Sequence, residues 1–216
     1  NAKNKQVKAA ALESLAKHDR PEITKIFGEL IQGDALGLLA GPFRTLRNKQ
    51  VLKSLLDEGQ KVFDLLLKGE VEQVARYLEI LDCLKERKGG ETEDFILNQF
   101  GQVERLPKFK APKKSQFVVF TTGEDIVDRL VWLLYEIGTP KAFEAVLAKR
   151  EALPPSAFHH VLYSALRAWS AEKVFAEFSP LLEQRKGPGK EKAEILERAI
   201  HASSRRRQGP FVALNC

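Results

Sequence analysis

The chain has 216 residues and a formal net charge of +6, and its length supports one large domain or two small ones without disulfide bonds. Its two cysteines, Cys83 and Cys216, have neither the spacing of a disulfide framework nor that of a metal site. No apolar stretch approaches the roughly 20 residues that span a bilayer, and the N-terminus lacks a charged-then-apolar signal pattern. We therefore expect a cytoplasmic protein with no membrane segment.

The expected helices follow from apolar residues that recur at three-and-four spacing in nearly every segment outside residues 105–123. This periodicity predicts an all-α protein. In chain order, the expected helices cover residues 5–17, 21–32, 35–56, 59–68, 70–87, 92–104, 124–137, 140–150, 155–169, 171–185 and 189–204, with 35–56 broken near Gly41-Pro42.

Helix-end residues support several of these boundaries. Gly138 is expected to end one helix, and Thr139 is expected to cap the next, which Pro140 opens. Ser170 is placed to cap a helix that runs through Phe178. These residues therefore predict helix boundaries near 138–140 and at 170.

The turns recur along the chain, near residues 20, 58, 90, 139 and 171. Such a period is typical of a two-helix repeat. The best internal match has an offset of 32 residues and aligns Leu130, Leu134, Ile137, Lys141 and Phe143 with Leu162, Leu166, Trp169, Lys173 and Phe175.

Residues 130–143, Leu-Val-Trp-Leu-Leu-Tyr-Glu-Ile-Gly-Thr-Pro-Lys-Ala-Phe, resemble a bacterial HEAT-like repeat of the ARM/HEAT superfamily, with Thr139 where that family usually has Asp. The resemblance implies an α-α superhelix, a solenoid of about five antiparallel helix pairs whose second helices line a concave binding face. We expect one continuous solenoid with N-terminal repeats (1–104), a Pro/Lys-rich basic linker (105–123), C-terminal repeats (124–204) and a tail (205–216).

Two segments hold the positive charge. Residues 105–123 contain five basic residues and no acidic one, and residues 185–207 contain eight basic and three acidic residues. Both segments could bind an anionic partner; alternatively, the first is a solvated loop pinned by Phe109 and Phe117, and the second offsets a helix dipole. The candidate residues are Arg105, Lys108, Lys110, Lys113, Lys114, Arg205, Arg206 and Arg207.

Aromatic residues at Trp132, Tyr135, Tyr163 and Trp169 suggest the base-binding pocket of HEAT-like DNA glycosylases, with Asp128 as the acid. Because Trp169 aligns with Ile137, a core position, we favour a structural role for these side chains. No catalytic constellation or nucleotide-binding motif is present.

Two further candidates receive a structural interpretation. His159 and His160 are adjacent, so their rings should diverge by about 100° and should not share a metal ion. Cys83 lies in an apolar helical run and is expected to be a small buried hydrophobe rather than a nucleophile. We therefore assign no catalytic, cofactor-binding or metal-binding residue and expect no cofactor.

The leading hypothesis is a non-enzymatic helical-repeat scaffold that binds a protein partner on its concave face. The first alternative is nucleic-acid binding through the basic linker and tail. A further alternative is an enzyme on this scaffold, either glycosylase-like or, by family association, a bilin-attachment enzyme. Apolar residues near both ends, 9–11 and 211–214, are compatible with a homodimer.

Overall fold

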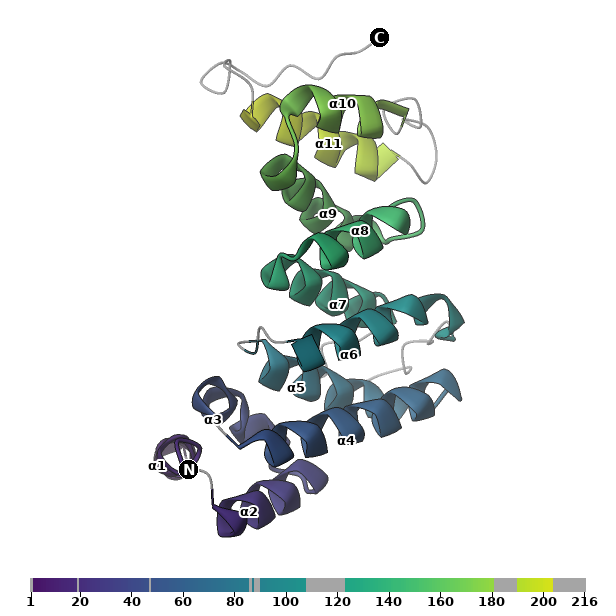
Figure 1. Cartoon of the computed structure of the whole chain (residues 1–216). Coiled ribbons are helices and arrows are strands. Elements are labelled where there is room, and N and C mark those ends of the chain that lie inside the picture. The colour runs from purple at the N-terminus through teal and green to yellow at the C-terminus, as the bar shows by residue number, and fades with distance from the viewer. Residues whose placement is uncertain are drawn as a thin grey trace. The chain divides into compact units, whose positions relative to one another are not determined.

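The computed structural model describes residues 2–18, 20–46, 48–85, 87, 90–107, 123–180 and 190–203. Every regular element in these ranges is a helix, which confirms the predicted all-α class (Figure 1). Contacts divide the chain into unit 1, Asn1–Ile137, and unit 2, Gly138–Cys216. Among the described residues, no helix combines the length and the apolar character needed to cross a bilayer.

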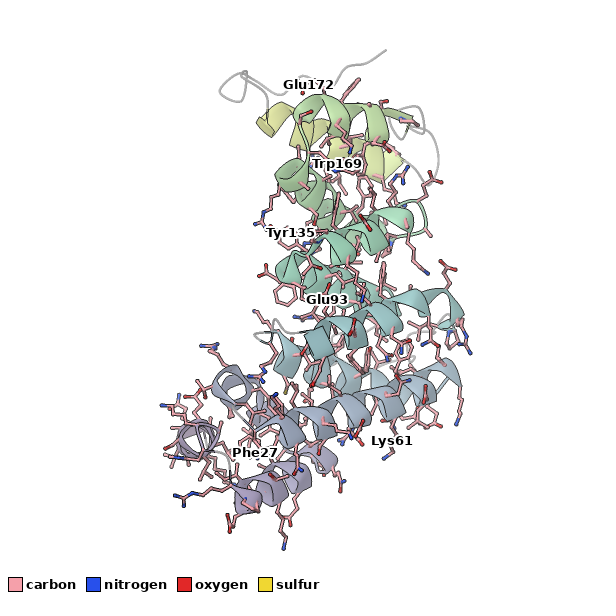
Figure 2. All side chains as sticks on the ribbon, in the orientation of Figure 1. Phe27, Lys61, Glu93, Tyr135, Trp169 and Glu172 are labelled. Atoms are coloured by element: carbon pink, nitrogen blue, oxygen red, sulfur yellow. The ribbon has the colours of Figure 1, made fainter. Side chains whose placement is uncertain are left out.

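Unit 1 begins with α1 (Ala2–Leu15), α2 (Pro21–Gln32), the 3-10 turn η1 (Leu36–Leu38), α3 (Ala40–Thr45) and α4 (Lys49–Leu67). Phe27 of α2 and Phe43 of α3 are both fully buried and meet edge to face, with their ring centroids 6.2 Å apart. Figure 2 shows Phe27 among the packed helices. The Lys61 side chain of α4, labelled in the same view, is 70% exposed. The sequence expectation for α2 was correct at both ends.

The predicted arrangement of residues 35–68 is wrong in two places. Pro42 lies in the first turn of α3, where a missing N–H costs no helical hydrogen bond. The break comes later, before Asn48, whose side chain caps α4 by accepting from the Val51 N–H at 3.0 Å. The expected turn near residue 58 does not exist, because α4 runs from Lys49 to Leu67 without interruption.

Gly59 explains this error. It lies in the middle of α4 and is buried, where a β-carbon would stand 2.8 Å from Phe95 Cζ and 3.2 Å from Ile80 Cγ2. The glycine is therefore present for close packing against neighbouring helices rather than for a turn.

The rest of unit 1 consists of η2 (Val71–Gln73), α5 (Val74–Leu84), α6 (Gly90–Gly101), η3 (Val103–Arg105) and α7 (Gly123–Ile137). Odd-numbered helices contact one another in the order α1, α3, α5 and α7, and even-numbered helices do so in the order α2, α4 and α6 (Figure 1). Contacts of α4 with α5 and of α6 with α7 join the two series.

Arginine side chains tie distant segments of unit 1 together. Arg76 of α5 donates to the carbonyl oxygens of Ile31 at 2.7 Å and Gly33 at 3.1 Å, at the end of α2. The same guanidinium binds Glu58 Oε1 of α4 at 2.9 Å. Arg87 donates to the Leu46 carbonyl at 2.6 Å, at the end of α3. These cations satisfy carbonyl groups that a helix end leaves without an internal partner.

Unit 2 contains α8 (Pro140–Ala148), α9 (Pro155–Ala168), α10 (Ala171–Phe178) and α11 (Lys190–Ser203). The predicted caps are confirmed: Thr139 Oγ1 accepts from the Ala142 N–H at 3.1 Å, and Ser170 Oγ accepts from the Lys173 N–H at 3.3 Å. Gly138 has a φ of +69°, a left-handed conformation that suits glycine.

The core of unit 2 lies where α8, α10 and α11 contact α9. Phe158 of α9 and Phe178 of α10 are fully buried, with ring centroids 5.9 Å apart. Lys192 of α11 is only 8% exposed and donates to the Glu151 carbonyl at 2.6 Å. Burial lowers the pKa of Lys192, so unit 2 uses one desolvated lysine where unit 1 uses two arginines.

Candidate functional site

Only one of the eight basic residues predicted to meet an anionic partner lies in the described ranges. Arg105 is exposed at the end of η3 and donates to Gln102 Oε1 at 2.8 Å. The other seven, Lys108, Lys110, Lys113, Lys114, Arg205, Arg206 and Arg207, lie outside the described residues. The same holds for the linker phenylalanines, so both interpretations of these segments stay predictions.

A cluster of aromatic and charged side chains lies where α5 meets α7 in unit 1. The half-buried indole of Trp132 has Lys85 Nζ at 4.8 Å and the Arg129 guanidinium carbon at 5.4 Å from its centroid. Both distances fall within the range of cation–π attraction. Arg129 also binds Asp82 Oδ1 at 2.9 Å. We call Asp82, Lys85, Arg129 and Trp132 the Trp132 cluster.

The helices that carry the Trp132 cluster are rich in acidic residues. Together α5 and α7 contain six acidic residues and two basic ones, with Lys85 directly after α5. The indole therefore has two cations of the chain next to it, Lys85 and Arg129, on helices in which acidic residues outnumber basic ones.

A second aromatic pair lies in unit 2. The Trp169 ring, directly after α9, meets Phe143 of α8 edge on at 5.1 Å, and Lys173 Nζ lies 4.2 Å from its centroid. Trp169 is half-buried, so it is less buried than the core position predicted for it. Tyr163 is 51% exposed and does not belong to the core either.

The two adjacent histidines of α9 do not diverge as predicted. The ring centroids of His159 and His160 are 3.7 Å apart, because side-chain rotation overrides the angle between their backbone positions. Burial, and next the nearby His159, lower the pKa of His160 to about 4, so His160 is neutral at pH 7. Within the described ranges, no group of three or more His, Cys, Asp and Glu side chains is suited to hold a metal ion.

Cys83 behaves as its apolar surroundings predict. It is 1% exposed, and burial raises the pKa of its thiol to about 12, with Asp82 and Glu79 adding to the shift. A thiol that stays protonated at neutral pH is a poor nucleophile. The expected burial of Cys83 is therefore confirmed.

Sequence reasoning missed most of the Trp132 cluster. Arg129 and Trp132 are three residues apart on one helix, a spacing that places them on the same face and was visible in the sequence. Lys85 and Asp82 come from another helix, so their approach depends on the packing of α5 against α7. Comparison of the chain with protein-family models, curated proteins and solved structures finds no match.

Proposed function

We propose that this protein is a non-enzymatic helical-repeat scaffold, similar to HEAT-like solenoids, that docks a segment of a protein partner. The alternating contacts of unit 1 support the proposal, since odd-numbered and even-numbered helices form separate series joined by α4–α5 and α6–α7. Stacked helix pairs produce this pattern, because each pair buries its apolar faces against the next pair.

A repeated burial pattern gives further support. At the offset of 32 residues, buried positions of α7 and α8 align with buried positions of α9 and α10. Ile126, Leu130, Leu133, Ala142 and Val146 correspond to Phe158, Leu162, Ala165, Val174 and Phe178, all buried. The two segments therefore use the same positions for packing, as expected for copies of one structural repeat.

We place protein docking on the α5–α7 face, at the Trp132 cluster, in place of the concave second-helix face expected from the sequence. The observation that carries this choice is the half-buried Trp132 indole with Lys85 Nζ at 4.8 Å and the Arg129 guanidinium carbon at 5.4 Å. Tryptophan and arginine are the residues most enriched among those that dominate binding energy at protein interfaces.

The charge of this face favours a basic protein segment as the partner. In the sequences of α5 and α7, acidic residues outnumber basic ones by six to two, and such an excess repels phosphate and attracts lysine and arginine. The Lys85 ammonium shows which ligand chemistry the indole accepts. On this account, a lysine of the partner takes the position over Trp132 that Lys85 now holds.

The test is fluorescence anisotropy of a labelled lysine-rich peptide titrated with the full chain at low salt. Lys85→Gln removes the competing ammonium, so the variant should bind the peptide several-fold more tightly than the wild type. Trp132→Leu should lose most of the binding. Lys61→Gln is the matched control, because it removes the same charge from an exposed site on α4.

Two results would contradict this function. Failure of the wild type to bind the lysine-rich peptide would exclude a basic protein segment as the partner. Equal affinities of the Lys85→Gln and Lys61→Gln variants would show that net charge, rather than the Trp132 ring, controls binding. Binding of a glutamate-rich peptide in place of the lysine-rich one would show that the partner is acidic rather than basic.

A further inference from the structure

The outward face of α9 has an unusual residue composition. Positions 159, 163 and 167 share one side of the helix, and this side carries His159, His160, Tyr163 and Arg167. Tyr163 and Arg167 are exposed and both histidines are half-buried. The opposite side is buried in the core of unit 2 through Ala157, Phe158, Val161, Leu162 and Ala165. The aromatic and basic side chains are therefore presented to solvent by a fixed helix.

The charged residue of α9 itself is a cation. Residues 155–168 include no aspartate and no glutamate, whereas exposed helix faces usually mix both signs. In the described part of unit 2, eight residues are basic and seven are acidic. α9 itself thus carries no carboxylate that would repel a phosphate backbone, in contrast to α5 and α7.

From this arrangement we propose that the outward face of α9 binds single-stranded nucleic acid, with Tyr163 stacking on a base and Arg167 contacting a phosphate. Aromatic rings interleaved with cations are the usual means by which proteins bind single strands without reading their sequence. The paired imidazoles, with ring centroids 3.7 Å apart and planes tilted by 43°, add two rings about one turn before Tyr163. The site is separate from the Trp132 cluster and does not depend on the protein-docking proposal.

Three side chains of this face have different roles in the proposed binding. The Tyr163 ring is 51% exposed, enough for one face to receive a base. Arg167 stands one helical turn further along the same side and supplies a guanidinium that can bind phosphate oxygens. His160 is neutral at pH 7, since its pKa is about 4, so it contributes a ring and a hydrogen-bonding nitrogen rather than a charge.

The experiment is anisotropy of a labelled oligothymidine titrated with the full chain at low and moderate salt. The wild type should bind the single strand more tightly than a duplex of equal length, because duplex bases are already stacked. Tyr163→Ala should lower the affinity about tenfold, whereas Tyr163→Phe should keep it. Arg167→Gln should weaken binding and reduce the slope of log affinity against log salt by about one.

Phe175 provides the matched control, since it is 50% exposed on α10 and Phe175→Ala removes an equal aromatic surface elsewhere in unit 2. Equal losses in Tyr163→Ala and Phe175→Ala would overturn the assignment to α9. If inorganic polyphosphate competed as well as an unlabelled oligonucleotide, the result would refute stacking of a base on Tyr163, because polyphosphate has no bases. No binding by the wild type, or preferential binding of a glutamate-rich peptide, would exclude nucleic acid as the ligand.

Discussion

The faces formed by α5 and α7 in unit 1 and by α9 in unit 2 are built from similar amphipathic helices but differ in charge. The first places two cations next to Trp132, on helices with six acidic residues and two basic ones. The second exposes Tyr163 and Arg167 on a helix without acidic residues. Buried positions repeat between α7–α8 and α9–α10, whereas the exposed positions between them differ, so packing sets the fold and leaves the exposed side chains variable.

The two units also differ in the type of side chain that links separate segments within each unit. Unit 1 uses Arg76, which bridges two carbonyl oxygens of the α2 end and Glu58. Unit 2 uses Lys192, which donates to the Glu151 carbonyl. A planar guanidinium can serve several acceptors at once and stays charged when buried, whereas an ammonium loses more on desolvation. The arginine tether should therefore contribute more stability.

The largest effect is expected for Arg76→Met. It leaves Glu58, with an 11% exposed side chain, without its closest cation and removes the donors to Ile31 and Gly33. We expect a loss of about 3 kcal/mol in the free energy of unfolding, as for other broken part-buried pairs. Urea unfolding followed by circular dichroism measures it. A loss below about 1 kcal/mol would show that the tether does not hold unit 1 together.

Gly59→Leu is expected to rank next, with a loss of about 2 kcal/mol, because the new side chain must displace Phe95 and Ile80. Gly28→Ala is the control, since Gly28 in α2 has no atom within 4 Å of an added β-carbon. That change should stabilise unit 1 by up to about 1 kcal/mol through helix propensity. Equal effects of the two substitutions, again by urea unfolding, would refute the packing role of Gly59.

Acidification should weaken unit 2. The folded pKa of His160, about 4, is below its ordinary value of 6.5, so between these values the unfolded chain binds more protons. The contribution of neutral His160 to the free energy of unfolding is complete above pH 6.5 and is lost as the pH falls toward 4. Because the ring is only half-buried, we expect about 1 kcal/mol, discounted for solvent screening.

His160→Gln should remove much of this pH dependence, and His159→Gln should remove less. Thermal unfolding at several values between pH 4 and pH 7 tests the order, with each variant referred to its own stability at pH 7. An unchanged slope in His160→Gln would show that another group controls the acid sensitivity.

The smallest effect is expected for Lys192→Met. The change removes the hydrogen bond to the Glu151 carbonyl, and it also removes the cost of burying the ammonium group. These effects offset each other, so the free energy of unfolding should change by less than about 1 kcal/mol. Urea unfolding beside Arg76→Met gives the comparison. A loss as large as that of Arg76→Met would erase the proposed difference between the tethers.

Local chemistry allowed much of the helix order to be predicted from the sequence. Thr139 and Ser170 cap the helices that they were expected to cap, since a hydroxyl accepts from an N–H only three residues away. Gly59 misled the prediction, because glycine is common in turns and its partners here, Phe95 and Ile80, come from other helices. The break before α4 is predicted near Pro42 but lies after α3. The reason is that proline is tolerated in the first turn of a helix, where Pro42 lies.

The sites were less predictable than the helices. The spacing of Arg129 and Trp132 was visible, but Lys85 reaches the indole only through the contact of α5 with α7. The alignment of Trp169 with Ile137 favours a structural role for Tyr163 as well. At the offset of 32 residues, however, Tyr163 is 51% exposed while its equivalent, Val131, is buried. Sequence periodicity locates a helix face, and tertiary packing decides whether that face is covered.

The most direct test of the contrast between the two faces uses the two tryptophans, which are the only ones in the chain. Trp132 reports on the α5–α7 face, and Trp169 directly follows α9. Their indole N–H resonances can be followed by ¹⁵N NMR while the full chain is titrated with a lysine-rich peptide and, separately, with oligothymidine. We predict that the peptide shifts the Trp132 resonance alone and the oligonucleotide shifts the Trp169 resonance alone. Shifts of the same resonance by both ligands, or of neither resonance by either ligand, would contradict the assignment of separate partners to the two faces.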